Sequence, residues 1–255
     1  MLLSIIIPIK NRAHIISDTL DSLNSDKFED TEIIVVDNNS NDNLNDILNN
    51  YKNVKYIKND IDRERSYSRN IGIKNANGNY ITFLDSDDLL DSDFLSYLKK
   101  AINNFSQDDF FFINFNYFND ERVIKNKNLF NKKFCEFSDL VNENKISNIG
   151  IVLKKKLAQE ILWDENNDII GTEDYDYVLR LMIKAKRAVL IDKKPLGNVR
   201  IHDGRSVYQD KRTKILKRFF YFKKKLYNLE IFKNIDYKNK KKLFLHKLYI
   251  HHYYF

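Results

Sequence analysis

Residues 80–90 constrain the fold of this chain more than any other stretch, because an apolar run ends there in a cluster of acidic residues. The run YITFL at 80–84 is β-branched and aromatic, is too short for a helix, and follows the turn signal NGN at 77–79. We therefore predict a buried strand. Asp85, Asp87 and Asp88 come directly after it, at the carboxyl end of the predicted strand, where ligands bind in open α/β sheets.

The acidic cluster predicts a partner of opposite charge. Carboxylates this close together repel one another unless a cation or hydrogen-bond donors offset their charge. Oxygen ligands on a short loop suit Mg²⁺ or Mn²⁺, which one or two carboxylates commonly hold while the cation bridges to phosphate oxygens. The alternative is a helix cap, formed by Asp85 or Ser86 on a helix that begins near Leu89. A cap alone does not require three acids, so we favour the cation site.

Length and composition indicate one large folded domain with an appendage. The chain has 255 residues, 43% of them hydrophobic, with only 6 Gly and 2 Pro, which argues against a disordered or linker-rich protein. A single cysteine, Cys135, excludes an intramolecular disulfide framework and fits the cytoplasm. We expect no signal peptide, because the apolar run at 2–9 is short and lacks a basic leader, and no run is long enough for a membrane span.

Strand and helix patterns alternate along the first half of the chain. We predict strands at 3–7, 32–36, 54–57 and 80–84, and helices at 13–23, 44–48, 65–75 and 91–105. This alternation predicts an α/β fold whose mainly parallel central sheet is flanked by helices. In the second half we predict strands at 110–118, 188–191 and 196–201, and helices at 155–162 and 174–184.

Six segments form an ordered set: SIIIPIKNR at 4–12, EIIVVDNNSND at 32–42, SRNIG at 68–72, DSDD at 85–88, GTED at 171–174 and RIH at 200–202. The set resembles the bacterial family 2 glycosyltransferases over residues 1–208 and is more specific than any one segment. The resemblance implies an inverting enzyme with a GT-A fold and a divalent cation. It divides the domain into a Rossmann-like nucleotide-sugar-binding half, 1–105, and an acceptor and catalytic half, 106–208.

The resemblance also assigns the donor-binding residues, which are Pro8, Asn11, Arg12, Asp37, Arg65, Arg69, Asp85 and Ser86. Asp37 would read the base of the nucleotide, although residues 37–40 also have the composition of an Asx turn, and both can hold at once. Arg65 and Arg69 share one helical face, where they would neutralise the donor diphosphate or lock the acidic cluster. Lys10 stands where the family often has an aromatic residue.

The metal and catalytic residues follow from the same resemblance. Asp87 would ligate the cation directly, with Asp85 and His202 beside it, while Asp88 orients the loop. A lone histidine is more often structural, but a neutral imidazole suits Mn²⁺ better than Mg²⁺. Asp174 becomes the candidate general base, and Glu173 would orient its loop or bind the acceptor. The alternative for both acids is a favourable interaction with the amino end of a helix.

The segment 209–255 differs in kind from the rest of the chain. It repeats apolar residues at helical spacing among lysines, and these apolar residues are Ile215, Phe219, Phe222, Leu226 and Leu229. A basic amphipathic helix of this kind is typical of an anionic membrane surface. The alternative is a helix that packs on the catalytic domain with a solvated basic face. Nucleic-acid binding is disfavoured, because no nucleic-acid motif accompanies the charge.

We therefore interpret the sequence as a metal-dependent inverting glycosyltransferase. It would transfer a sugar from a nucleotide-diphosphate donor, with UDP as the first choice, to a glycan or lipid-linked glycan in bacterial surface polysaccharide biosynthesis, working peripherally on the cytoplasmic face of the inner membrane. One alternative is a nucleotidyltransferase, but the glycine-rich basic loop usual after its first strand is missing. The other is a nucleotide-sugar-binding or scaffold protein without activity.

Overall fold

The computed structural model describes residues 1–23, 28–119, 121–140, 144–202, 221 and 224–225. Its strands are β1 (Leu3–Ile9), β2 (Thr31–Asp37), β3 (Val54–Lys58), β4 (Tyr80–Phe83), β5 (Leu89–Leu90), β6 (Phe110–Phe118), β7 (Val123–Ile124), β8 (Phe134–Glu136), β9 (Val152–Lys154) and β10 (Arg187–Arg200). Its helices are α1 (Ala13–Leu23), α2 (Leu44–Leu48), α3 (Arg65–Asn75), α4 (Phe94–Asn104), α5 (Phe137–Leu140), α6 (Lys155–Glu160), the 3-10 helix η2 (Asn167–Ile169) and α7 (Glu173–Ala185).

All of these strands join one sheet, with the order β3-β2-β1-β4-β9-β6-β10-β5 and with β7 and β8 paired to β6 and β10. The half made of β3, β2, β1 and β4 is parallel throughout. Beyond it the sheet is mixed, because β9 runs antiparallel to both β4 and β6, whereas β10 runs parallel to β6. The predicted α/β fold with parallel strands in its first half is confirmed, and the second half adds antiparallel strands.

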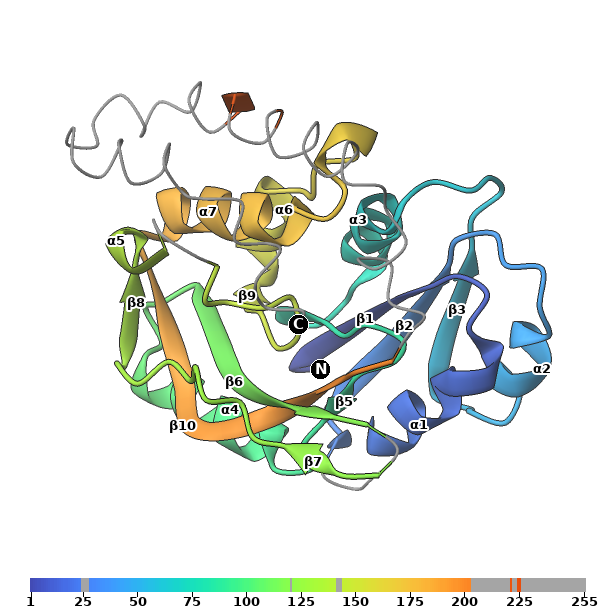
Figure 1. Ribbon diagram of the computed structural model, residues 1–255, viewed down its shortest axis with the longest axis horizontal. Helices are drawn as coiled ribbons and strands as arrows, with labels where there is room; N and C mark the ends of the chain where they lie inside the picture. The colour runs from blue at the N-terminus through green and yellow to red at the C-terminus, as the bar shows by residue number, and fades with distance from the viewer. Residues whose placement is uncertain (24–27, 120, 141–143, 203–220, 222–223, 226–255) are drawn as a thin grey trace.

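Helices cover both faces of the sheet (Figure 1). Strand β1 is buried along its whole length and alternates between the faces. Ile6 packs with Phe83 and Tyr177 in the core beneath α3, α6 and α7. Ile5 and Leu20 belong to the core of the opposite face, beneath α1, α2 and α4. A continuous apolar run is expected for a strand covered on both faces, so the sequence of β1 explains its central place.

Several element boundaries differ from the predictions. The predicted strands at 188–191 and 196–201 are one strand, β10, whose register with β6 shifts between Leu190 and Gly197. This irregularity accommodates Pro195, which has no N–H for a regular ladder. The predicted helix at 91–105 begins later, at Phe94, and the predicted helix at 155–162 ends earlier, at Glu160. Within the described residues, no helix is both long and apolar enough to cross a membrane.

The parallel half of the sheet brings distant segments to one edge. Because β1, β2 and β4 are parallel neighbours, the residues that follow them lie at the same end of the sheet. Asn11 and Asp85 follow β1 and β4, Asp37 is the last residue of β2, and His202 follows the end of β10. The topology therefore gathers four of the six segments of the ordered set, and α3 and α7 supply two more from one face of the sheet.

Candidate active site

Each acid of the loop after β4 accepts at least one hydrogen bond. Arg69 Nη2 donates to Asp85 Oδ1 at 2.8 Å. Asp87 Oδ2 accepts from Arg12 and lies 2.9 Å from His202 Nε2. Asp88 Oδ1 accepts from the backbone N–H of Arg200 at 3.0 Å. The repulsion expected within the cluster is therefore offset in this structure by basic side chains and a backbone donor.

Arg69 is the centre of the buried part of the site. Its side chain is fully buried, and its Nη1 lies 3.5 Å from Asp174 Oδ1 in addition to the bond with Asp85. The guanidinium carbon lies 4.3 Å from the centre of the Trp163 ring, which stacks on Tyr177. Of the two roles predicted for Arg69, these contacts agree with locking the acids, and contact with the donor diphosphate stays a prediction.

The two acids that share Arg69 differ in their proton affinity. Burial raises the pKa of Asp85, but the charges of Arg69 and Arg65 outweigh burial, so the net pKa is lowered. Burial raises the pKa of Asp174 to about 7, against the lowering effect of Arg69 and with a further rise from Glu173. The side chain of Asp174 is nevertheless 38% exposed, so a substrate can reach it. Asp85 is thus held ionised, whereas Asp174 has a pKa close to neutral pH. Different pKa values of neighbouring carboxyl groups separate acid and base roles in active sites.

Glu173 is buried at the start of α7 and holds the loop before it. Its Oε2 accepts from the backbone N–H of Gly171, and its Oε1 lies 3.7 Å from Arg65 Nε. Gly171 has φ +86, a left-handed conformation that favours glycine. Of the two roles predicted for Glu173, these contacts agree with orientation of the loop before α7, and acceptor binding stays a prediction.

The donor-side residues form a network of turns at the ends of β1 and β2. Asp37 is buried, its Oδ1 accepts from Ser40 N at 2.8 Å, and its Oδ2 accepts from Tyr56 Oη at 2.7 Å. Asn11 takes φ 51 and donates its N–H to Ser40 Oγ at 2.9 Å. The Asp37 side chain therefore closes a local turn over residues 37–40, but its bond reaches the N–H three residues on and not the N–H two residues on that an Asx turn requires. Base recognition by Asp37 remains a prediction, and its carboxyl oxygens retain further lone pairs for it.

Other donor-side predictions differ in their accessibility. Pro8 lies within β1, opposite Val36, and Ser86 is buried in the acidic loop. Lys10 is exposed and pairs with Asp62, whose other oxygen accepts from Asn38 Nδ2 at 2.7 Å. The position that the family often fills with an aromatic residue thus carries an ion pair here.

Asp87 and His202 lie at a separation that one divalent cation could bridge, although in this structure they contact each other directly and Asp87 Oδ2 also pairs with Arg12. Two ligands at right angles on one cation, with bonds of about 2.1 Å, are about 3 Å apart, and the observed distance from Asp87 Oδ2 to His202 Nε2 is 2.9 Å. A carboxylate with an imidazole suits Mn²⁺. Within the described residues, no three His, Cys, Asp or Glu side chains gather as a metal-binding group. Donor phosphates and waters would therefore complete the coordination, and Asp85, which is already held by Arg69, stays a predicted ligand.

The structure adds contacts that the sequence interpretation did not assign. Asn148 donates from Nδ2 to Asp85 Oδ1 at 3.0 Å, and Asn70 binds both the N–H and the C=O of Trp163. Arg200 donates from Nε to the carbonyl of Asp87 at 3.1 Å and ties the acidic loop to β10. Asn70 and Arg200 lie inside the recognised segments SRNIG and RIH, so a signal was present. Trp163 is the only tryptophan of the chain and carried no local signal.

The comparisons with known proteins agree with this arrangement. The model of glycosyl transferase family 2 matches residues 4–162. An uncharacterized glycosyltransferase of Haemophilus influenzae is 30% identical over 205 residues, which are 78% of this chain and 79% of that protein. A GalNAc(5)-diNAcBac-PP-undecaprenol beta-1,3-glucosyltransferase of Campylobacter jejuni is 35% identical over 106 residues, which are 40% of this chain and only 34% of the relative.

Among solved structures, S. aureus TarS 1-349 in complex with UDP-GlcNAc superposes with a TM-score of 0.76 at 19% identity, covering 95% of this chain and 70% of that chain. The sheet order, the helices on both faces and this superposition define the fold as GT-A. The family model spans more than half of the sequence, so the chain belongs to glycosyl transferase family 2. The protein is therefore an enzyme of the transferase class.

Proposed function

We propose that this enzyme transfers a sugar from a UDP-linked donor to a hydroxyl of a lipid-linked glycan, with inversion at the anomeric carbon. The observation that carries the proposal is the pair of acids on Arg69, with Asp85 held ionised and Asp174 partly exposed with a pKa of about 7. The UDP-GlcNAc bound by TarS supports the donor class. The name of the Campylobacter relative, which specifies a glycan on undecaprenol diphosphate, supports the acceptor class.

In this mechanism Asp174 is the general base. Its carboxylate takes the proton of the acceptor hydroxyl while the acceptor oxygen forms a bond to the anomeric carbon. The bond from that carbon to the donor phosphate breaks, and its electron pair leaves with the nucleoside diphosphate. Attack from the face opposite the leaving group inverts the anomeric centre. Arg69 keeps Asp174 beside Asp85, and Glu173 fixes the loop that leads into the first turn of α7, where Asp174 lies.

On the donor side, Asp87 and His202 would hold Mn²⁺ or Mg²⁺, and a bound cation neutralises the charge that develops on the leaving diphosphate. Arg12, which contacts Asp87, and Arg65 add positive charge near the same loop. Asp37 and Asn11 would contact the nucleoside from the turns after β2 and β1. A lipid-linked acceptor implies a peripheral place on the cytoplasmic face of the inner membrane.

Donor binding and turnover test this function together. We expect a UDP-sugar with Mn²⁺ to raise the melting temperature more than any other nucleotide sugar in a panel, because a ligand that binds only the folded state stabilises it. Incubation of the stabilising donor with undecaprenol-linked glycan should then release UDP and extend the glycan. A purified, folded enzyme that is stabilised by no nucleotide sugar and releases no nucleoside diphosphate would contradict the proposal.

A further inference from the structure

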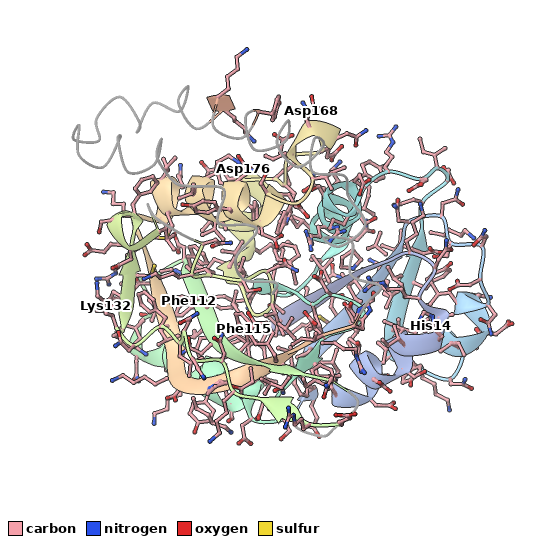
Figure 2. The ribbon with its side chains drawn as sticks, in the orientation of Figure 1. His14, Phe112, Phe115, Lys132, Asp168 and Asp176 are labelled. Atoms are coloured by element: carbon pink, nitrogen blue, oxygen red, sulfur yellow. The ribbon has the colours of Figure 1, made fainter. Side chains whose placement is uncertain are left out.

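Asp176 is a second buried acid in the first turn of α7 and takes no part in the mechanism above. Its side chain is fully buried, and Figure 2 labels it on α7. Residues two apart on a helix point to nearly opposite sides. Asp174 faces Arg69, and Asp176 therefore faces away from the reacting groups. A buried carboxylate is stable only when it is paired, so the partners of Asp176 decide how firmly this turn of the helix is held.

The partners of Asp176 come from its own helix and from the C-terminal extension. Arg180, one turn along α7, lies 2.8 Å from Asp176 Oδ2 through its Nε. Lys225 Nζ lies 2.8 Å from Asp176 Oδ1 and also pairs with Asp164. The Lys225 side chain is only 23% exposed, so water screens these ion pairs less than it screens those of a fully exposed lysine.

Tyr221 provides a second and independent contact of the extension. Its hydroxyl accepts from Asn166 Nδ2 at 2.7 Å, and its side chain packs against the core beneath α3, α6 and α7. Tyr221 and Lys225 therefore both contact the segment 164–166 that precedes α7. Of the two alternatives for the extension, packing on the catalytic domain applies at these residues, while the apolar residues predicted to face a membrane lie outside the described part of the chain.

These contacts connect the extension to the candidate base through a short chain of packed residues. Asp164 follows Trp163, whose ring stacks on Tyr177 at 3.9 Å between centroids and lies beneath Arg69. Arg69 in turn contacts Asp174. The first turn of α7 is thus held from two sides, by Arg69 on the side of Asp174 and by Lys225 on the side of Asp176.

We propose that Lys225 is a positioning residue for Asp174. By neutralising Asp176 and Asp164 together, it fixes the start of α7 and the segment before it, so that Asp174 stays at the distance from the acceptor that proton transfer requires. This inference rests on the proposed function for its kinetic part only. The ion pairs themselves are tested by stability, which needs no substrate.

The experiment compares Lys225→Met with Lys224→Met, because Lys224 is the adjacent, exposed lysine of the same segment. We expect Lys225→Met to lower the melting temperature by roughly 4 to 8 °C, since it leaves buried carboxylate charge under-neutralised. We expect its kcat to fall by about tenfold with the donor KM within about twofold of the wild type, because only the geometry at the base changes. Lys224→Met should match the wild type in both measurements.

Two further variants separate positioning from general destabilisation. Lys225→Arg keeps the positive charge and should restore most of kcat. The double variant Asp176→Asn/Lys225→Met should lose much less stability than the sum of the losses of the two single variants, because the two residues contact each other. Equal melting and turnover for Lys225→Met and Lys224→Met would overturn the proposal. A lower melting temperature with unchanged kcat would leave Lys225 as a stabilising residue and overturn the positioning role. If the wild type transfers no sugar from any donor, the positioning role fails along with the proposed function, but a melting difference would still establish the ion pairs.

Discussion

At the scale of single residues, the site depends on a few charges that are shared rather than paired one to one. Arg69 serves both Asp85 and Asp174, and Asp87 serves both Arg12 and His202. When two acids share one arginine, each acid affects the other. If one acid is removed, the guanidinium interacts with the remaining acid alone. The pKa of Asp174 therefore depends on the charged groups around it, and single substitutions test this dependence.

Replacing Asp174 with asparagine should lower kcat by about a hundredfold or more and leave donor binding nearly unchanged, as expected when a general base is lost from an intact donor site. Turnover assays and UDP titration by calorimetry measure the two quantities. Asp168→Asn serves as the control, because Asp168 is an exposed acid of the short helix before α7 (Figure 2). A loss of UDP affinity as large as the loss of kcat would place Asp174 in the donor site instead.

The pH dependence follows from the pKa of Asp174, which burial raises to about 7. A general base works only when it is deprotonated, so kcat/KM should fall as the pH drops below about 7, and this limb should vanish from the residual activity of Asp174→Asn. The folded state holds this proton more tightly than the unfolded state does. The contribution of Asp174 to stability should therefore decline as the pH rises from the ordinary pKa of an aspartate, 3.8, to about 7. An acid limb near pH 4 would contradict the raised pKa.

Asp87→Ala should abolish transfer and weaken Mn²⁺-dependent UDP binding by about tenfold or more, because it removes the carboxylate shared by Arg12 and His202. Folding should survive the change, since the Asp87 carbonyl still accepts from Arg200. Calorimetric titration of UDP with and without Mn²⁺ separates the metal-dependent part of the affinity. Unchanged turnover at matched Mn²⁺ would remove Asp87 from the site.

At the scale of elements, short segments between the strands set the geometry of the acids. Asn148, which donates to Asp85, lies two residues before Gly150. Gly150 takes φ +72, and a Cβ at this position would clash with the side chain of Ile113. A side chain at this position would meet both a strained backbone and the core. The loop that carries Asn148 to Asp85 is therefore sensitive to a substitution that changes no charged group.

Gly150→Ala should destabilise the protein by about 2 to 3 kcal/mol, through left-handed strain together with a clash on Ile113. Gly171→Ala is the matched control, because Gly171 also has a positive φ but has open space where a Cβ would lie, and it should cost about 1 kcal/mol. Urea unfolding of the two variants gives the comparison. Equal losses of unfolding free energy would show that only the backbone strain matters and that Ile113 moves to make room for the added Cβ.

The elements also show what the sequence can and cannot predict. Strands such as β1 and β4 were predictable, because central parallel strands read as continuous apolar runs. Strand β9 was not, since three residues carry no periodicity and its partners β4 and β6 are distant in the sequence. The same limit applies to the site. The turn that begins at Asp37 follows from local composition, whereas the contact of Arg69 with Trp163 joins segments that only the fold brings together.

At the scale of the whole molecule, the extension predicted to begin at residue 209 contacts the rest of the chain at the residues that the structure describes. Tyr221 and Lys225 contact the segment before α7 and α7 itself. The lysine-rich composition of the extension still predicts attraction to anionic lipid, worth about 1 kcal/mol for each lysine near the surface. Packing at some residues and membrane binding at others are compatible, and they respond differently to salt.

Truncation after Tyr208 tests both properties in one protein. We expect a lower melting temperature, because the truncated chain loses the packing of Tyr221 and leaves Asp176 with Arg180 as its remaining described partner. If the lysine-rich stretch also binds membrane, full-length protein should co-sediment with anionic vesicles at low salt and detach at high salt, since exposed charges are screened. The truncated protein should not co-sediment. Full-length protein that ignores vesicles at every salt concentration, while truncation still lowers the melting temperature, would reduce the extension to a structural part of the catalytic half.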